Sequence, residues 1–346
     1  MVGSFMVRRE LRINLKRAVI SVTILLIVIV LAFILLARQN LSEILRTLQS
    51  ANTLFVSLAL GVYVFSILLW ATRWKIAISA TGHNAGLRNL FLAVWGSVFV
   101  NNITPFTYAG GDPFARTYLL KKMTRTPFSS GFAAIAGEFL LDLPVFLSFL
   151  AAGVLLSLGW VSTSLVLFLL GLWFVVVVLV VPLSPTMLGR RVAAGKISGL
   201  IWRMAKLLKL KTTRPKVSRA VVHFYDGAHN VVQGRKRVLS MMLISLALWI
   251  LIMVRFFLIF RAIGYLPSMH VLLMAATIPP IVGLLPVLPG GLGTVDVAYL
   301  FIFTFEFNPT VAFSVVVIER AITYVFGTLV GACALSYLGI RIWTKK

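Results

Sequence analysis

One segment of the apolar C-terminal third reads Leu285-Pro286-Val287-Leu288-Pro289-Gly290-Gly291-Leu292-Gly293-Thr294-Val295-Asp296. Its two prolines and three glycines disfavour a continuous helix, because proline removes an amide donor and glycine loses more backbone entropy on ordering. Broken, polar backbone at membrane depth is tolerated only where protein or a water-filled cavity surrounds it. The segment therefore predicts the turn of a re-entrant hairpin at Pro289, Gly290, Gly291 and Gly293.

A second break of the same kind lies in the N-terminal third and reads Pro105-Phe106-Thr107-Tyr108-Ala109-Gly110-Gly111-Asp112-Pro113. Basic residues flank it on both sides, Arg88 before the break and Lys121 and Lys122 after it. Lys and Arg collect on the cytoplasmic side of membrane proteins, so both ends of this segment are expected inside. The break is therefore interpreted as a second re-entrant hairpin, whose turn residues are Pro105, Gly110 and Gly111.

The composition is that of a membrane protein. The chain has 346 residues, of which 60% are hydrophobic and only 12% charged, and its mean hydropathy is +1.00. Several apolar runs reach the roughly 20 residues that a spanning helix needs. The formal net charge of +24 would suit nucleic acid in a soluble protein. Here the positive-inside rule explains it, and no nucleic-acid partner is expected.

The fold class expected is an all-α polytopic membrane protein with about six full spans and two re-entrant hairpins. The second span returns the chain to the cytoplasm at Arg73, and both termini are placed in the cytoplasm of a multi-pass plasma-membrane protein. A higher count, in which each hairpin limb crosses the bilayer, stays open. The six full spans are expected at residues 18–37, 54–71, 129–158, 161–181, 238–260 and 311–340.

Residues 1–346 are expected to form a single transmembrane domain that contains an inverted repeat. Residues 54–158 form the first unit and residues 238–340 the second; between them, residues 183–237 form a basic cytoplasmic segment with amphipathic character. Gly111 precedes Glu138 by 27 residues, and Gly291 precedes Glu319 by 28. The first hairpin enters from inside and the second from outside. Inverted units with broken helices are typical of secondary transporters, which bind their substrate near the bilayer midplane.

Charged residues within the apolar spans and beside the turns are the candidate substrate-binding and transport residues. Ionisable side chains inside a membrane are costly and find partners, so pairs that only fasten the hairpins are an alternative interpretation. Arginine suits a phosphate because its planar fork donates two hydrogen bonds at once. A helix beginning after each turn would add the positive end of its dipole. The candidates are Asp112, Arg116, Glu138, Asp142, Arg255, Asp296, Glu319 and Arg320.

Enzyme motifs are sparse in this sequence. Gly290-Gly291-Leu292-Gly293 continues with Thr294 rather than a lysine, so no Walker A motif is present. The four histidines are scattered without zinc-ligand spacing. We therefore expect no catalytic residues, no metal site and no cofactor.

Several of these motifs together resemble the lysylphosphatidylglycerol synthetase transmembrane-region family over about residues 18–340. They are Ala109-Gly110-Gly111-Asp112-Pro113-Phe114-Ala115-Arg116, Glu138 with Asp142, Leu288-Pro289-Gly290-Gly291-Leu292-Gly293 with Asp296, and Glu319-Arg320. The resemblance implies inverted re-entrant hairpins and a flippase-like role in handling lipids. Family motifs usually have Glu at positions 112 and 296, and Arg where Phe139 stands. The chain ends at Lys346, so lysyl transfer by a fused soluble domain is not expected.

These observations predict a lipid flippase or scramblase that moves an anionic phospholipid or a polyprenyl-phosphate-linked sugar lipid through a polar cavity at the midplane. The expected partners are membrane lipids, and the oligomeric state stays open, a homodimer included. A membrane-embedded lipid-modifying enzyme and an ion or small-solute secondary transporter are the alternatives.

Overall fold

The computed structural model describes residues 41–104, 112–124, 126–180, 226, 230–231, 234–284 and 289–339. Every regular element within these ranges is a helix. Four helical segments are long and apolar enough to cross a membrane: α3 (Thr53–Ala80), α6 (Phe128–Ser157), α10 (Arg235–Ala262) and the segment Pro309–Tyr337. The last consists of α13 (Pro309–Arg320), a π-helical turn η4 (Ala321–Phe326) and α14 (Gly327–Tyr337). The all-helical membrane class predicted from the sequence is confirmed.

The other two predicted spans are described less completely. The run at residues 18–37 lies outside the described residues, as does most of the basic segment 183–237. The run at 161–181 corresponds to the apolar helix α7 (Thr163–Val180). The short helix α2 (Leu41–Gln49) precedes α3 and packs against α13, where Glu43 accepts a hydrogen bond of 3.1 Å from the Thr310 hydroxyl.

The end predicted for the second span was wrong. The sequence placed Arg73 at a cytoplasmic helix end after residue 71, but α3 continues to Ala80 and buries Arg73 within it. The following Trp74 is also fully buried. The basic residue marks an ion pair inside the bundle rather than a membrane boundary, because acidic side chains from another helix neutralise it there.

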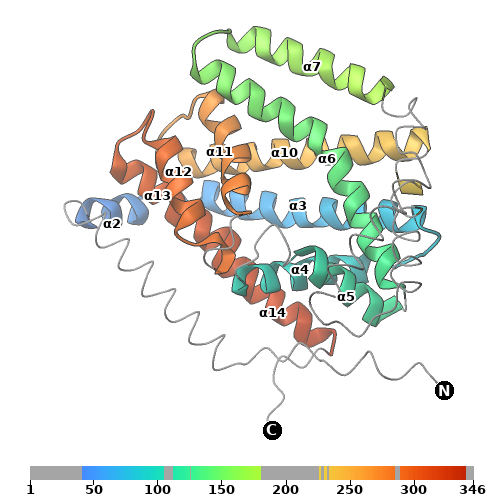
Figure 1. Cartoon of the computed structure of the whole chain (residues 1–346). Helices are drawn as coiled ribbons and strands as arrows, with labels where there is room; N and C mark the ends of the chain where they lie inside the picture. The colour runs from blue at the N-terminus through green and yellow to red at the C-terminus, as the bar shows by residue number, and fades with distance from the viewer. Residues whose placement is uncertain are drawn as a thin grey trace, which may run out of the picture.

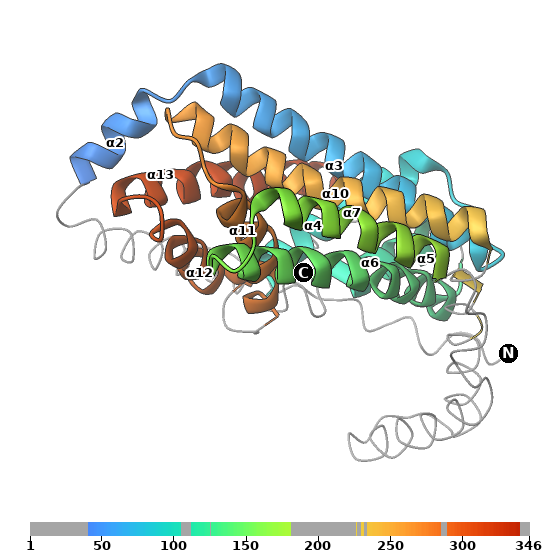
Figure 2. The same ribbon diagram turned by 90° about the horizontal axis from the view of Figure 1, so that it is seen from above.

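Two long helices, α3 and α10, form the centre of the bundle and run antiparallel to each other. The backbone N–H of Asn52, which caps the start of α3, donates a 2.7 Å hydrogen bond to the carbonyl of Ala262 at the end of α10. Figure 2 shows the two helices side by side along their length. In the same view α6, α7, α11 and α12 lie on the α10 side of this pair, and α3 lies along the outer edge.

Two pairs of shorter helices flank the two predicted breaks. The first pair is α4 (Leu87–Ile103) and α5 (Asp112–Thr124), and the second is α11 (Met269–Val282) and α12 (Thr294–Phe303). Each helix has 10 to 17 residues, fewer than the roughly 20 that cross a bilayer. Within each pair the two helices pack against each other.

The turn of the second pair is described from Pro289 onward. A short 3-10 turn, η3 (Pro289–Gly291), precedes α12, and Gly290, Gly291 and Gly293 have φ of 65°, 65° and 80°. L-residues with a side chain rarely adopt such a conformation, so the glycines are needed here for the backbone itself. The predicted turn residues Pro105, Gly110 and Gly111 of the first pair lie outside the described residues.

The two halves of the chain exchange contacts. Helix α4 of the first half packs on α14 of the second, and α11 of the second half packs on α6 of the first. Glycines allow these close approaches. A Cβ on Gly331 would come within 2.5 Å of the Trp95 carbonyl oxygen, and one on Gly153 within 3.1 Å of the Leu273 Cβ. Each helix pair therefore rests on the acid-bearing span of the other half.

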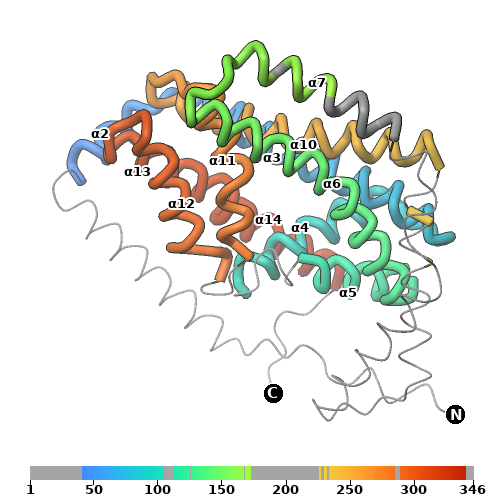
Figure 3. The backbone as a smooth tube through the Cα atoms, turned by 45° about the horizontal axis from the view of Figure 1, so that its top comes forward, coloured from blue at the N-terminus to red at the C-terminus, as the bar shows by residue number. Residues whose placement is uncertain are grey.

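The turn of the second helix pair contacts the end of α4, and Figure 3 shows α11 and α12 extending toward α4. The backbone N–H of Gly290 donates a 3.2 Å hydrogen bond to the carbonyl of Thr104, the residue that ends α4. A Cβ on Gly290 would lie 2.5 Å from the Tyr324 ring and 3.0 Å from the Asn102 carbonyl oxygen. The second break thus packs against the last turn of α4.

Candidate functional site

Charged side chains from three helices gather beside the first helix pair. We call this group the first cluster. Arg116 of α5 donates to both neighbouring acids, from Nη1 to Glu138 Oε2 at 2.9 Å and from Nε to Asp112 Oδ2 at 3.0 Å. Arg73 of α3 donates from Nη1 to Asp142 Oδ1 at 2.5 Å. The first cluster consists of Arg73, Asp112, Arg116, Glu138 and Asp142.

The local sequence explains how these side chains meet. Asp112 is the first residue of α5, and Arg116 lies one turn later on the same face. Glu138 and Asp142 are likewise one turn apart on α6. The two carboxylates can lie close together because cations separate them: Arg73 contacts both, with its Nε 3.6 Å from Glu138 Oε1.

A second cluster lies beside the second helix pair and contains Arg255, Asp296, Glu319 and Arg320. Arg255 of α10 binds Glu319 through two parallel hydrogen bonds, Nε to Oε2 at 3.0 Å and Nη2 to Oε1 at 2.8 Å. Arg320 donates from Nε to Asp296 Oδ1, and Asp296 Oδ2 accepts from the Gly293 N–H at 2.9 Å. All eight candidate residues predicted from the sequence therefore lie in one of two ion-paired groups.

The two clusters occupy matching places in the two halves. Arg73 lies 20 residues after the first residue of α3, and Arg255 lies 20 after the first residue of α10. Glu138 lies 10 residues after the start of α6, and Glu319 lies 10 after the start of α13. An Arg–Glu contact thus recurs between equivalent helices, which favours an internal duplication over a chance likeness of glycine motifs.

The clusters differ at the residue after the shared glutamate. In the second cluster, Arg320 follows Glu319 and binds Asp296. In the first, Phe139 follows Glu138 and is half exposed. Arg116 on α5 supplies the missing cation there and binds Asp112 as well as Glu138. In the first cluster the second cation therefore comes from α5, whereas in the second cluster it comes from the residue next to the glutamate.

Aromatic rings complete the surroundings of the arginines. The guanidinium carbon of Arg116 lies 4.8 Å from the Trp70 ring centroid and 5.1 Å from that of Trp74. The corresponding distance from Arg255 to Tyr63 is 5.5 Å. A ring face attracts a cation most strongly where water is excluded, and Arg116 is fully buried. These contacts offset part of the desolvation of both guanidinium groups.

Charge balance and exposure distinguish the parts of the two clusters. The first cluster has three carboxylates and two guanidinium groups, and the second has two of each. Glu138 and Glu319 are buried, with 1% and 2% exposure. The side chains of Asp142, Asp296 and Arg320 are 18%, 18% and 19% exposed. These are the edges at which a polar group from outside would first meet each cluster.

The helix N-termini that the sequence suggested for an anion already hold carboxylates. Asp112 begins α5 and Asp296 lies in the first turn of α12. A carboxylate at a helix N-terminus is favourable because it neutralises the positive end of the helix dipole. An anionic ligand would therefore compete with the protein's own acids, and the arginines are the groups left to recognise it.

Polar side chains also form hydrogen bonds where the second turn contacts the end of α4. The Asn102 amide donates a 2.9 Å hydrogen bond to the Thr328 hydroxyl, and the Tyr324 hydroxyl donates a 3.2 Å bond to the Asn102 carbonyl. Tyr324 belongs to the π-helical turn η4, which directly follows Arg320. Single π-helical turns occur frequently at functional sites. This contact couples the second cluster to the end of α4.

Sequence reasoning missed three polar residues of the first cluster and its shell. These are Arg73, Ser97, whose hydroxyl donates to Asp112 Oδ1 at 2.6 Å, and Ser245, which accepts from Arg73 Nη1 at 2.8 Å. The available signal for Arg73 was its place in a long apolar run, equivalent to that of Arg255. Single serines in apolar helices carry no such signal.

No metal site is found within the described ranges, where no group of three or more His, Cys, Asp or Glu side chains converges. The carboxylates of both clusters face arginines instead. The arrangement is suited to recognising an anion by exchange of ion-pair partners.

Comparison with known proteins gives a consistent result. The family described as "Lysylphosphatidylglycerol synthase TM region" matches residues 18–331. A UPF0104 membrane protein of Methanothermobacter thermautotrophicus is 28% identical over 334 residues, covering 92% of this chain and 97% of the relative. One of Methanocaldococcus jannaschii is 27% identical over 341 residues, covering 96% and 99%. One of Pyrococcus horikoshii is 23% identical over 316 residues, covering 89% and 94%. No solved structure matches the chain.

Proposed function

Because this chain belongs to the lysylphosphatidylglycerol synthase transmembrane-region family, we propose that it moves a lipid with an anionic headgroup between the two leaflets of a membrane. The headgroup is that of a phospholipid or of a polyprenyl-phosphate-linked sugar. The observation that carries the proposal is a pair of buried Arg–Glu ion pairs, one beside each helix pair, together with the contact of the second turn with the end of α4, Gly290 on Thr104.

The proposed membrane arrangement has six full spans and two hairpins that enter from opposite faces. Three features support it. The helices of both pairs are too short to cross a bilayer. The second turn contacts the end of α4, as expected for hairpins that end near the midplane. Finally, the equivalent Arg–Glu contacts relate the two halves. The proposal puts the chain in the plasma membrane, with both termini in the cytoplasm, because basic residues collect on the cytoplasmic side.

The clusters provide a way to pass a phosphate through the protein without leaving an arginine unpaired. In the empty site, carboxylates neutralise the arginines, which keeps buried charge low. A phosphate that enters at an exposed edge can take the place of Asp296 on Arg320, or of Asp142 on Arg73. Bidentate Arg–phosphate bonds are strong and directional. Arg116 and Arg255, with Asp112, Glu138 and Glu319, hold the clusters in place and offer further positions for the phosphate.

Reconstitution tests this proposal. Purified protein is placed in vesicles containing fluorescent phosphatidylglycerol, or a fluorescent polyprenyl-phosphate sugar. A quencher that cannot cross the membrane is added outside, and the fluorescence of lipid that started in the inner leaflet is followed as it is lost. The chain should accelerate movement of at least one of these lipids. Arg320→Gln should slow it about tenfold or more, because a hydrogen bond to a charged group contributes about 1.5–3 kcal/mol. Arg320→Lys should fall between the two, since it keeps the charge and loses the fork.

Arg88→Gln is the matched control, because Arg88 is exposed, contacts Tyr337 and belongs to neither cluster. It should leave the rate unchanged. If no candidate lipid moves faster with protein than without it, the proposal fails. If an Arg320→Gln variant has the wild-type gel-filtration profile and unfolding midpoint and also moves lipid at the wild-type rate, the Arg320–Asp296 pair only holds the hairpin in place.

A further inference from the structure

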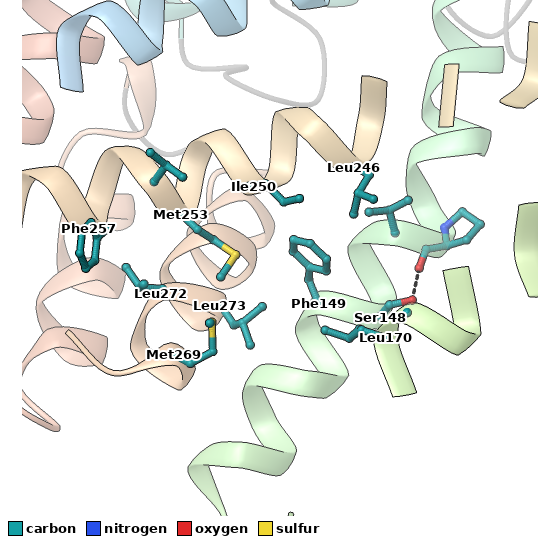
Figure 4. A pocket seen from close by; sticks show the side chains of 14 residues that line it. Ser148, Phe149, Leu170, Leu246, Ile250, Met253, Phe257, Met269, Leu272 and Leu273 are labelled. Carbon is teal, nitrogen blue, oxygen red and sulfur yellow. Dashed lines mark hydrogen bonds between the residues drawn. The ribbon is translucent and has the colours of Figure 1, made fainter. Parts of the chain in front are cut away.

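A cavity of about 430 Å³ lies between α6, α7, α10 and α11, away from the contact of the second turn with α4. Figure 4 shows side chains from all four helices around it, among them Phe149, Leu170, Leu246, Met253 and Leu273. The lining is apolar. Its hydroxyl group, that of Ser148, donates a 2.6 Å hydrogen bond to the Pro144 carbonyl and offers no donor to the interior.

Two residues that line this cavity lie close in sequence to polar partners of Arg73. Leu246 lines the cavity, and the preceding residue, Ser245, accepts a hydrogen bond from Arg73. Val145 also lines it and lies one turn after Asp142 on α6. Asp142 is the partly exposed acid of the Arg73–Asp142 pair. Helices α6 and α10 thus carry both lining residues of the apolar cavity and, within a turn of them, the polar partners of Arg73.

We propose that this cavity holds a hydrocarbon chain of a membrane lipid whose phosphate lies at the Arg73–Asp142 pair. The inference rests on the proposed function and names the place of the lipid tail within it. The cavity of about 430 Å³ leaves room for a stretch of hydrocarbon chain between the four helices.

Other occupants fit this site less well. Water needs two to four polar partners, and the lining offers almost none. A polar solute would lose its hydration without replacement. A hydrocarbon chain has no such requirement, and Met253 and Met269 provide flexible side chains that adapt to its shape. The Arg73–Asp142 pair then selects a lipid, which carries both a chain and a phosphate, over a plain hydrocarbon.

Gly171 of α7 permits a direct test. It lines the cavity, and a Cβ there would meet no atom within 4 Å. Gly171→Phe therefore fills the cavity without displacing existing side chains. Gly61→Phe is the matched control: Gly61 also has open space around its Cβ position, but it lines a different hollow, between α3 and α4.

The probe is phosphatidylglycerol with a photoreactive diazirine in one acyl chain, mixed into vesicles that contain the full-length protein. After irradiation, labelled peptides are mapped by mass spectrometry. We expect label on α6 and α10 around Phe149 and Met253 in wild type and in Gly61→Phe, and loss of this label to the background level in Gly171→Phe. If Gly171→Phe does not fold, Ile250→Trp is used as a second cavity-filling variant, and the same loss of label is expected.

The wild-type labelling map alone is enough to overturn the proposal, if label falls outside the four lining helices. Equal labelling in wild type and in a folded cavity-filling variant would overturn it too. The outcome is separable from that of the transport assay. Label in the cavity without lipid movement supports the tail site and contradicts the proposed function. Lipid movement without label in the cavity supports the function and contradicts the tail site.

Discussion

Arginine, rather than lysine, is the residue on which both clusters depend. Arg116 uses different nitrogens of one guanidinium group to bind Asp112 and Glu138, and Arg255 places two parallel bonds on Glu319. A compact ammonium group cannot reproduce either geometry. Buried charges are tolerated because each faces an opposite charge, and removing one partner leaves the other uncompensated.

Arg116→Gln should therefore destabilise the protein strongly, by about 3–5 kcal/mol, the usual cost of breaking a buried pair. Arg116 is fully buried, and its loss leaves Glu138, which is 1% exposed, with only the longer 3.6 Å contact to Arg73. The measurement is the midpoint of thermal unfolding in detergent, with Arg88→Gln as the control on an exposed arginine. The double variant Arg116→Gln/Glu138→Gln should recover part of the loss. A single variant as stable as wild type would show that water reaches this pair.

At the scale of elements, the second helix pair depends on a turn that only glycine can form. Gly290, Gly291 and Gly293 have positive φ, and Gly290 also packs against Tyr324 and the Asn102 carbonyl. Asp296 then fixes the start of α12 by accepting a hydrogen bond from Gly293. The turn glycines thus allow the positive-φ backbone, permit the close contact with α4 and position Asp296 in the second cluster.

Replacing Gly290 with alanine should destabilise the protein by more than about 1 kcal/mol, because the native backbone conformation is incompatible with a side chain. The added Cβ would also lie 2.5 Å from the Tyr324 ring. Gly61→Ala is the control, since Gly61 has open space and an ordinary helical conformation. Thermal unfolding should separate the two variants clearly. Equal midpoints would mean that the contact of the second turn with α4 contributes little to stability.

At the scale of the whole molecule, the two halves are interleaved rather than placed side by side. Helix α4 lies on α14 and α11 on α6, so neither half buries its own helix pair completely. A pathway between the halves would therefore open by movement of a helix pair against the opposite span. The proposed hairpin topology sets which side of the membrane each pair starts from.

Cysteine labelling in a Cys333→Ala background tests that topology. Arg88→Cys and Lys122→Cys, at the open end of the first pair, should react only with a reagent supplied on the cytoplasmic side. Ser268→Cys and Phe305→Cys, at the open end of the second pair, should react only from outside intact cells. Labelling of Arg88→Cys and Lys122→Cys from opposite sides would contradict the hairpin and support complete crossings by α4 and α5.

Much of the candidate site was predictable because charges are rare in apolar helices. Asp112, Arg116, Glu138, Asp142, Arg255, Asp296, Glu319 and Arg320 were all recognised from their apolar surroundings, and all lie in the two clusters. Arg73 was misplaced because a basic residue near a helix end looks the same in sequence whether it faces the cytoplasm or a buried acid. Only the length of α3 and its packing distinguish the two.

The sequence by itself determined the helical membrane class and the two breaks, since these follow from local composition, from proline and glycine, and from the cost of charge in lipid. Tertiary structure alone decided which arginine pairs with which acid, because the partners lie 4 to 69 residues apart in the chain. It also decided that the second turn contacts the end of α4 and that an apolar cavity lies between α6, α7, α10 and α11. Such features depend on how helices distant in sequence pack, which no local pattern specifies.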